Sequence, residues 1–554
     1  MGQGTQRSML QEKTSVVIVG AGPSGLALAS ELGMRGVHCL LIERNERVGI
    51  APRAKTTNVR TRTHLRRWGI AQQLAEQSPF GVDYPSTIRF VTRLGGYPLA
   101  AIENASNCDP TRSELYPEHG QWVPQYRLEA VLREHVEQLP TVTLALATEL
   151  VDAAQDDRNV RLTLRDCATG ALRHLACDFA VGADGARSRM REIVGATMAG
   201  NYGLSRNYNV VFRAPGMREA HRHGPATMYW QVNDDAPSLI GPMDRDDIWF
   251  FMPTRLPDGV SLTPESAPAL IARSTGIDLP VEVLSCDEWV ASSLIADTYC
   301  SGRLFLIGDA CHLHPPFGGF GMNMGIADGV DLGWKLAAVL QHWGGERLLE
   351  SYQVERRAIH QEVIAEATAN HSILSNDFRD DRLELPGPDG DQVRSAIGER
   401  IVAAKRREFH TLGTVLGGCY RQSPVIRFDN EAAAPTDPTI YRPSSGPGCL
   451  APHAWMGDGR SLYDLFGQGF TLLVTSAAPA EDIAAAEQDA NARGVPLTIV
   501  RLPSDVTARA YPRALTLVRS DQYVAWRGDR WRDDAIAYAA GLENATTAEP
   551  VGGT

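Results

Sequence analysis

A glycine-rich turn between a buried strand and a helix constrains this chain more than any other feature of its sequence. The segment Ser15–Val19 (SVVIV) is continuously apolar and β-branched, which is typical of a strand buried on both faces of a parallel sheet. Gly20, Gly22 and Gly25 follow at once in a GxGxxG spacing, and LALASELGMRG then reads as a helix ending in glycine. The chain therefore begins with a strand, a tight turn and a helix.

This turn is suited to a nucleotide diphosphate. Gly20 permits the tight turn, Gly22 lets the backbone approach a pyrophosphate at the helix N-terminus, and Gly25 lets helix and strand pack closely. A second apolar strand at 37–42 ends at Glu43, where a carboxylate can bind a ribose hydroxyl pair. Together these elements predict a dinucleotide-binding domain, although the motif alone leaves NAD and FAD open.

Two later segments repeat the pattern of a strand that ends in a glycine and aspartate turn. Residues 179–186 (FAVGADGA) place Asp184 after a strand, and 303–309 (RLFLIGD) place Asp309 after another. The second turn leads into a glycine-rich helix start at Gly321. Taken alone, either aspartate would be a helix cap or a turn former. Three phosphate- or sugar-suited turns in one chain favour a nucleotide site instead.

The rest of the chain indicates further units. β-rich stretches at 90–100 and 205–255, separated by Pro, Gly and Asp turns, are typical of an antiparallel sheet. Helical periodicity returns at 326–340 and 352–366. A charged, Pro- and Gly-rich stretch at 376–395 predicts a surface connection, and 432–448 predicts a domain boundary. A small α/β unit follows, with strands at 469–474, 497–500 and 514–518 and a helix at 480–493.

Charge and cysteine usage exclude several classes of protein. With 54 Lys and Arg against 66 Asp and Glu, the net charge of -12 argues against nucleic acid or an anionic membrane surface as a partner. No apolar run approaches the length of a membrane span. The nine cysteines share no CxxC spacing, which makes zinc motifs and a disulfide framework unexpected. With no signal peptide at the start, we expect a reduced cytoplasmic protein.

Histidine pairs raise the question of a metal. His312 and His314 form only an HxH pair, for which the sequence suggests no third ligand, and His221 with His223 does the same. We therefore expect no metal site.

The three turns, the intervening sheet and the small C-terminal unit together resemble the group A flavoprotein monooxygenases, the para-hydroxybenzoate hydroxylase family. The likeness is greatest to its phenol hydroxylase and aromatic-polyketide hydroxylase branches. It covers 15–375 and, more loosely, 440–535. The resemblance implies a Rossmann-like FAD-binding domain with an inserted antiparallel β-sheet substrate domain and a C-terminal thioredoxin-like α/β domain. The boundaries we expect are 14–80, 116–198 and 296–375 for FAD, 81–115 and 199–295 for substrate, 376–435 for a helical linker region, and 440–554 for the thioredoxin-like domain.

The resemblance also assigns roles to single residues. It implies that Gly20, Gly22 and Gly25 grip the FAD diphosphate and that Glu43 holds the adenosine ribose. Arg44 joins the cofactor-binding set, and Gln125 would lie near the ribityl and phosphate groups. Asp184 would lie near both FAD and NAD(P)H, and Asp309 would bind the ribityl chain. Arg53 would contact the FAD diphosphate region and the incoming nicotinamide, and is one of two predicted catalytic residues.

Physical reasoning extends this assignment to the glycine-rich helix start. Reduced flavin carries negative charge that backbone N–H groups at a helix N-terminus can stabilise, which adds Gly321, Met322 and Asn323 to the cofactor-binding set. Pro316, the second predicted catalytic residue, would fix the chain ahead of that helix.

Aromatic residues of the β-rich region supply the candidates for substrate contact. Tyr229 and Trp230 lie in one expected strand, and Trp249 and Phe250 lie in another. Alternation places half of each strand towards a core, so packing is the commoner role for any one of them. Arg213 is a candidate for a phenolate or carboxylate, against the alternative of an ordinary surface arginine.

The function implied is that of an FAD-dependent monooxygenase. Such an enzyme uses NADPH or NADH as a transient electron donor and O₂ to hydroxylate a small phenolic or fused aromatic substrate through a C4a-hydroperoxyflavin. A Baeyer–Villiger or ring-opening oxygenase on the same scaffold remains an alternative, as does an idle flavin-binding protein. Residues 450–554 contain no cysteine, so the C-terminal unit cannot exchange dithiols. A structural role or a role in subunit contact, as in a homodimer, is expected for it.

Overall fold

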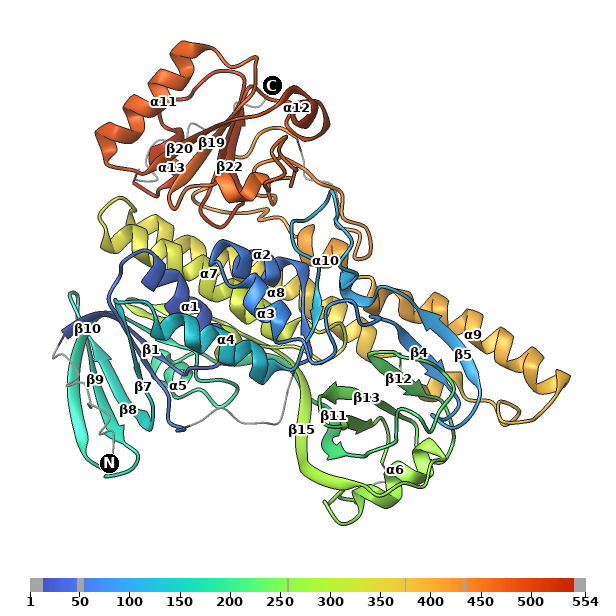
Figure 1. Cartoon of the computed structure of the whole chain (residues 1–554). Helices are drawn as coiled ribbons and strands as arrows, with labels where there is room; N and C mark the ends of the chain where they lie inside the picture. Colours follow the sequence, from blue (N-terminus) through green and yellow to red (C-terminus); the bar gives the residue numbers. More distant parts are fainter. Residues whose placement is uncertain (1–12, 47–53, 257–258, 374, 432–434, 543–554) are drawn as a thin grey trace, which may run out of the picture.

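Two large sheets, a smaller third one and a two-stranded sheet of β3 (Thr56–Thr57) and β6 (Gln121–Trp122), linked by long helices, make up the described part of this computed structural model (Figure 1). The structure describes residues 13–46, 54–256, 259–373, 375–431 and 435–542. Within this part of the chain, no helix is both long and apolar enough to cross a membrane.

The first sheet contains the predicted dinucleotide-binding turns. Its strands are β1 (Lys13–Val19), β2 (Cys39–Ile42), β7 (Val142–Ala145), β8 (Thr148–Gln155), β9 (Val160–Asp166), β10 (Leu172–Gly182), β16 (Cys300–Ser301) and β17 (Leu304–Leu306). The main path runs β16-β17-β10-β1-β2-β7, and β8 and β9 extend from β10 as an antiparallel pair. The central pairings from β17 to β7 are parallel. Their buried aliphatic side chains explain the continuous apolar runs in the sequence.

Helices cover this sheet and lead towards the other domains. They are α1 (Pro23–Met34), α2 (Val59–Arg67), α3 (Ala71–Glu76), α4 (Gln125–Glu137), α5 (Arg189–Val194), α7 (Gly321–Leu340) and α8 (Glu346–His371). Glycines let α1 and α7 pack closely: a Cβ on Gly329 would lie 2.8 Å from the carbonyl oxygen of Ser24, and one on Gly333 would lie 2.7 Å from the Cβ of Glu31. Because α7 reaches α1 in this way, its N-terminus is held next to the first nucleotide turn.

The second sheet is the β-rich insert. It has the order β18-β15-β11-β14-β13-β12-β4-β5. The strands are β4 (Ile88–Val91), β5 (Pro98–Ile102), β11 (Met198–Arg213), β12 (Met228–Gln231), β13 (Ser238–Asp244), β14 (Ile248–Pro253), β15 (Glu282–Ala296) and β18 (His312–Leu313). All neighbours are antiparallel except β12 and β4, which run parallel. The sheet is antiparallel as predicted except at this pair, which joins segments far apart in the sequence.

Helices cover both faces of the second sheet. One face packs against α6 (Ala267–Thr275), and the other packs against α9 (Pro388–Phe409). The prediction that 376–395 is a surface connection is wrong from Pro388 onwards. Pro388 at the first helical position, with Asp389 and Asp391 in the first turn, provides helix-start signals that the overall charge of the stretch obscures.

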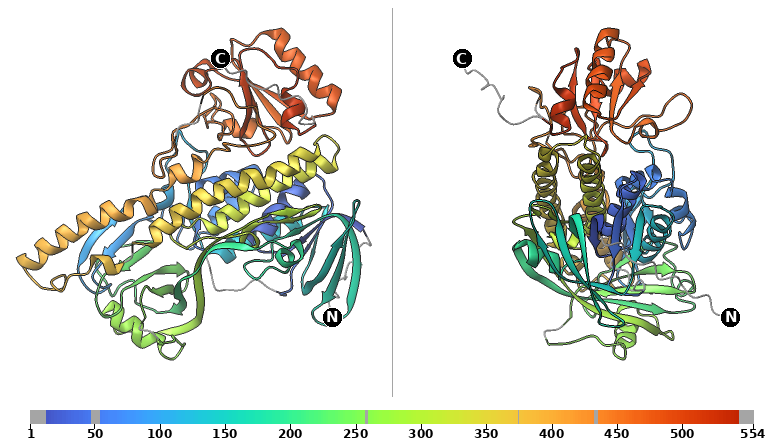
Figure 2. Two further views of the ribbon diagram at one scale, coloured as in Figure 1. Left: turned by 180° about the vertical axis from the view of Figure 1, so that it is seen from behind. Right: turned by 90° about the vertical axis from the view of Figure 1, so that its left-hand side faces the viewer.

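The C-terminal domain is built on the third sheet, of order β20-β19-β21-β22. Its strands are β19 (Phe470–Val474), β20 (Leu497–Arg501), β21 (Leu515–Val518) and β22 (Val524–Gly528), and its helices are α11 (Ala480–Arg493), α12 (Ser504–Ala510) and α13 (Ala535–Ala539). The β19 and β20 pair is parallel, and the other pairs are antiparallel. This domain lies over α2, α7 and α8 in each view (Figures 1 and 2).

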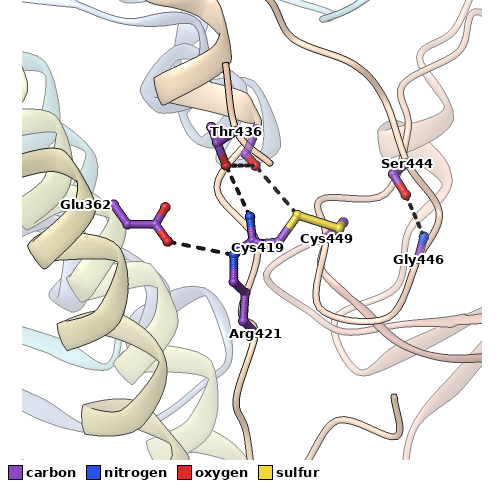
Figure 3. Close-up of a disulfide and its surroundings, with 8 residues drawn as sticks. Glu362, Cys419, Arg421, Thr436, Ser444, Gly446 and Cys449 are labelled. Carbon is purple, nitrogen blue, oxygen red and sulfur yellow. Dashed lines mark hydrogen bonds and ion pairs between the residues drawn. A yellow bond between two sulfur atoms is a disulfide. The ribbon is translucent and has the colours of Figure 1, made fainter. Parts of the chain in front are cut away.

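A disulfide joins Cys419 to Cys449 in the segment that leads into the C-terminal domain (Figure 3). The expectation that the cysteines stay reduced is wrong for this pair. A backbone hydrogen bond from Tyr420 to Gly448 holds the two segments together, and the Cα atoms of the cysteines lie 4.3 Å apart. A sequence separation of 30 residues carries no local signal for such pairing.

Buried charges attach the C-terminal domain to α7 and α8. The guanidinium of Arg519, fully buried, lies 2.6 Å from Glu355, 3.1 Å from Asp331 and 2.6 Å from Asp521. The ammonium of Lys335 lies 2.9 Å from Asp331 and 2.7 Å from Glu355. These five side chains, from three elements, form one network that we call the interdomain charge cluster.

Candidate active site

The three predicted turns lie side by side at one edge of the first sheet. Val19 of β1 is paired with Ile42 of β2 on one side and with Gly182 of β10 on the other, and Gly182 is paired with Leu306 of β17. Because the strands are parallel, their carboxyl ends meet at the same edge, where open α/β sheets bind ligands. The residues that follow these strands include Gly20, Glu43, Asp184 and Asp309, so all four lie at this edge.

The first turn has the geometry that a diphosphate requires. Gly20 has φ of 106°, and a Cβ there would lie 2.4 Å from the carbonyl oxygen of Ala183. A Cβ on Gly25 would lie 1.9 Å from the carbonyl oxygen of Gly20. At Gly22, by contrast, a Cβ would meet nothing within 4 Å. Two glycines therefore close the turn, while the third faces open space at the N-terminus of α1, and the turn fits a phosphate group.

The carboxylate of Glu43 closes the same turn from β2. It accepts a hydrogen bond of 3.0 Å from the backbone N–H of Ala21 and two from Asn45, at 3.0 Å from the backbone and 2.7 Å from the side chain. Arg44 is exposed next to it. Glu43 thus lies at the place predicted for a ribose-binding acid, held by two backbone N–H groups.

Asp184 organises the second turn. Its carboxylate accepts hydrogen bonds from the hydroxyl of Ser188 and, at 3.0 Å, from the backbone N–H of Met190 at the start of α5. Arg191 then donates to the carbonyl oxygen of Ala186 at 2.8 Å and to that of Ala310 at 3.1 Å. The side chain of Asp184 is therefore engaged in capping, and Arg191 fastens the second turn to the third.

The third turn depends on a residue that the sequence analysis did not select, Asp328 of α7. Its carboxylate accepts a 3.0 Å hydrogen bond from the backbone N–H of Gly308 and lies 2.7 Å from His312, 2.8 Å from Arg356 and 3.0 Å from His360. Burial alone would raise the pKa of Asp328, but His360, Arg356 and His312 hold it well below its ordinary value. An ionised Asp328 therefore anchors the turn that presents the partly buried Asp309.

The same cluster bears on the expectation that His312 has no further potential metal ligands around it. Cys311, His312 and Asp328 bring three potential ligand atoms within 4.8 Å of one another, so such ligands do exist. The arrangement does not fit a cation, because both carboxylate oxygens of Asp328 already accept hydrogen bonds and one of the donors is the guanidinium of Arg356. We interpret it as a hydrogen-bonded anchor.

The start of α7 is held in place by the side chain of Asn323. Its amide oxygen accepts hydrogen bonds from the backbone of Asn58 at 3.0 Å and the hydroxyl of Thr61 at 2.8 Å. Its NH₂ group donates to the carbonyl oxygens of Thr56 at 3.0 Å and Gly319 at 2.8 Å. All hydrogen-bonding positions of this amide are therefore taken by protein groups, and the side chain of Asn323 positions the helix start. The groups left for the predicted cofactor contact are backbone N–H groups.

Two other predicted residues, Gln125 and Pro316, belong to segments next to this region. Gln125 begins α4; its backbone N–H donates to the carbonyl oxygen of Ala54 at 3.0 Å, and its side chain donates to Glu129 at 2.7 Å. The carbonyl oxygen of Pro316, between β18 and α7, accepts a hydrogen bond from Gly319 at 3.2 Å. Arg53 lies outside the described residues.

The structure divides the four predicted aromatics between the two faces of the second sheet. Trp230 and Phe250 belong to the cluster that also contains Phe317, from the loop ahead of α7, and the Trp230 and Phe317 ring centroids are 6.0 Å apart. Tyr229 and Trp249 face the other way and pack with α6. Alternation therefore turns Tyr229 and Trp249 away from the nucleotide edge, which favours packing over substrate contact for these two residues.

Arg213 also lies apart from this region. It stands at the end of β11 beside the turn to residue 214, and its guanidinium pairs with Glu282 of β15 at 2.7 Å. Both side chains are substantially exposed, at 39% and 61%. This pairing favours the alternative of an ordinary surface arginine for Arg213.

Comparison with known proteins agrees with this geometry. Residues 13–367 match the family described as FAD binding domain, and residues 444–548 match the family described as aromatic-ring hydroxylase, C-terminal. The chain belongs to the flavin-dependent aromatic-ring hydroxylases. It is an FAD-dependent monooxygenase of the predicted fold class, so the predicted family, cofactor and reaction class are confirmed.

Curated relatives and solved structures align with most of the chain. Aklavinone 12-hydroxylase of Streptomyces peucetius is 32% identical over 84% of this chain and 92% of its own. Tetracenomycin B2 monooxygenase-dioxygenase of Streptomyces olivaceus is 30% identical over 95% and 97%. The rebeccamycin biosynthetic enzyme RebC with reduced flavin has a TM-score of 0.87 at 33% identity, covering 96% of this chain and 99% of the other. The flavin-dependent monooxygenase PieE, solved with FAD and substrate, has a TM-score of 0.86 at 28% identity over 96% and 99%.

Proposed function

We propose that this hydroxylase takes electrons from NADPH or NADH and inserts one oxygen atom of O₂ into a phenolic or fused aromatic ring. The proposal rests on the contact between one face of the second sheet and the loop ahead of α7. The apolar sheet face with Trp230 and Phe250 packs against Phe317, in the loop that leads from the third turn to the start of α7. The names of three relatives support this substrate class, because those proteins are named for aklavinone, tetracenomycin B2 and 4-methyl-5-nitrocatechol.

Within this proposal the sheet edge holds FAD. The open space at Gly22 and the N-terminus of α1 would take the diphosphate, Glu43 the adenosine ribose, and Asp309 the ribityl chain. Arg44, Arg53 and Gln125 complete the proposed set. Asp184 contributes by holding α5 and, through Arg191, the neighbouring turn.

Bound FAD supplies the transfer of two electrons and the activation of O₂. The chain's own residues do the rest. Backbone N–H groups of Gly321 and Met322, in the first turn of α7, are donors for negative charge on the cofactor. Pro316 restricts the loop ahead of that helix, and Trp230 and Phe250 exclude water and orient a flat ring.

Oxidation of NADPH and NADH by the FAD-loaded protein tests the proposal. We expect consumption to rise when phenols, nitrophenols or polycyclic phenols are added, with a product heavier by one oxygen atom and an intact ring. A ring-expanded or opened product would indicate the Baeyer–Villiger or ring-opening alternative. Consumption that no aromatic compound stimulates would contradict the proposal.

Gly22→Leu is a sharp test of the FAD site, because a side chain at this position enters open space and leaves the fold intact. We expect a folded protein that purifies without flavin, since the side chain occupies the proposed diphosphate position. Gly457→Leu is the matched control, because a side chain on this exposed turn also meets nothing within 4 Å and the backbone has no positive φ. Full flavin occupancy in folded Gly22→Leu would show that the diphosphate lies elsewhere.

A further inference from the structure

The few lysines of this chain differ in whether a carboxylate lies next to the ammonium group. The sequence has four lysines, at 13, 55, 335 and 405. Lys335 and Lys405 are buried, and each is paired with acids: Lys335 belongs to the interdomain charge cluster, and the ammonium of Lys405 lies 2.7 Å from Glu408. In both cases a neighbouring carboxylate offsets the cost of burying the charge.

Lys55 differs from these two. Its ammonium lies 3.9 Å from the centroid of the Phe250 ring, and no carboxylate among the described residues pairs with it. Burial lowers the pKa of Lys55 to about 8. A ring face provides only part of the stabilisation that an ion pair would give a desolvated ammonium. The side chain therefore carries a positive charge for which the described protein supplies no counter-charge.

The position of Lys55 joins the two halves of the site. Its carbonyl oxygen accepts a hydrogen bond of 2.8 Å from Val123, and the next residue, Thr56, is bonded to Asn323 at the start of α7. Its ammonium reaches the second sheet at Phe250, on the same face as Trp230. A molecule bound between the sheet face and the helix start would therefore meet this ammonium.

The sheet packs closely around the ring in this contact. Phe250 is paired with Gly241 of β13, and a Cβ there would lie 2.9 Å from the Phe250 ring and 2.6 Å from the carbonyl oxygen of Thr227. Any larger residue would displace the ring on which the Lys55 ammonium rests. The absence of a side chain at Gly241 thus preserves the placement of both groups.

We propose that Lys55 binds an anionic oxygen carried by the aromatic substrate, either an ionised ring hydroxyl or a ring carboxylate. This inference rests on the proposed hydroxylase function and names the substrate feature that the site selects. For a ring hydroxyl, the O–H bond breaks and the proton goes to solvent or to a neutral Lys55 amine, which leaves a phenolate paired with an ammonium. The phenolate makes the ring carbons ortho and para to it more electron-rich.

Binding of matched aromatic probes to the full-length, FAD-loaded protein tests this inference. One set is 4-nitrophenol, 4-nitroanisole and 4-nitrobenzoate, and the other is 2-hydroxyanthraquinone, 2-methoxyanthraquinone and anthraquinone-2-carboxylate. Dissociation constants come from the change in the flavin spectrum, and the phenolate band reports the ionisation of the bound hydroxyl compounds. We expect the wild type to favour an anionic probe over its methyl ether by roughly 10-fold or more, the value of a charge-assisted hydrogen bond.

Lys55→Met is the decisive variant, because methionine has a similar length and removes the charge of this partly buried side chain while keeping most of its apolar part. We expect its thermal midpoint to be unchanged or raised and its preference for anionic probes to disappear. Lys55→Arg keeps the charge and should retain part of the preference. Preference for the hydroxyl probe or for the carboxylate probe identifies which oxyanion is bound.

Two outcomes overturn the inference and remain distinguishable from failure of the proposed function. Equal affinity of the wild type for a methyl ether and its anionic partners, or an unchanged preference in Lys55→Met, would remove the role of Lys55 while leaving aromatic binding intact. If no aromatic probe binds the wild type or stimulates NAD(P)H oxidation, the proposed function and this inference fail together.

Discussion

Two buried aspartates one turn apart on α7 show opposite electrostatic behaviour. Asp328 lies under the third nucleotide turn, and the pKa of its carboxyl is held well below the ordinary value. Asp331 lies in the interdomain charge cluster, where burial, Glu355 and Asp521 raise its pKa to about 7 against the opposing effect of Lys335 and Arg519. The residue type and the helix are the same, so the difference comes from the surrounding charges.

The count of charges accounts for the contrast. Asp328 is the acid to which Arg356 and two histidines bond. In the interdomain charge cluster, Asp331 shares the cations Arg519 and Lys335 with two further acids, Glu355 and Asp521. Glu355 is the acid whose ionised form these two cations stabilise most. Burial would raise the pKa of Glu355, but Arg519 and Lys335 hold it at about 2. The excess acid of this group is Asp331, which therefore keeps its proton to a higher pH.

The largest expected effect comes from removing the cation that the acids share. Arg519→Met leaves Glu355 and Asp331 buried with Lys335 alone, and we expect a loss of about 3–5 kcal/mol in the free energy of unfolding. The measurement is denaturant unfolding followed by fluorescence. Arg513→Met, which removes a half-exposed arginine from pairs with Asp529 and Glu431, is the control and should cost about 0–1 kcal/mol. Equal losses in the two variants would show that the buried cluster contributes nothing special.

The next effect concerns the anchor of the third turn. Asp328→Asn keeps the shape but leaves Arg356 without its counter-charge, and we expect a loss of about 1.5–3 kcal/mol. Because Gly308 also loses its charged acceptor, FAD affinity should fall roughly 10-fold, equivalent to about 1.4 kcal/mol. Asp331→Asn, one turn away, serves as the control and should leave FAD affinity unchanged. A folded Asp328→Asn protein with wild-type affinity would detach this residue from the cofactor site.

The third effect is a pH dependence specific to Asp331, which is small at any one pH step. Its pKa rises from an ordinary 3.8 to about 7 in the folded state, so its contribution to stability is present below pH 3.8 and is lost as the pH rises towards 7. Asp331→Asn cannot ionise. The wild type should therefore lose stability relative to this variant between pH 5 and 7, by at most about 1.4 kcal/mol per pH unit. Parallel thermal-midpoint curves for the two proteins would refute the raised pKa.

The sequence predicted the parts of the site whose causes are local. Gly20 is required by its own backbone φ of 106°, Gly25 is required by the carbonyl oxygen of Gly20 in the same turn, and Glu43 follows directly from the end of a strand. Asp328 could not be found in this way, because its partners come from β18, α8 and the third turn. The available signal was the presence of Asp328, Asp331 and Lys335 within a helix that is otherwise apolar.

The aromatic candidates illustrate a second limit. Alternation predicts that Trp230 and Phe250 fall on one face and Tyr229 and Trp249 on the other only once the strand register is known. Because α6 covers one face and α9 the other, both faces are apolar, and the residue pattern cannot say which one meets the cofactor. Lys55 escaped notice for a similar reason, since its contact with Phe250 joins segments that are distant in the chain.

Arg519 has a consequence for how freely this C-terminal domain can be exchanged. A fragment that ends before Arg519 would keep Asp331 on α7 and Glu355 on α8 but would lose the arginine that pairs with both acids. The domain is separate in topology, yet its attachment combines this set of charges with an apolar contact, in which Trp334 and Trp343 pack against Phe470. Chimaeras that combine halves from different relatives are therefore expected to keep the charge pairing only when one parent supplies the acids at 331 and 355 and the other supplies the arginine at 519.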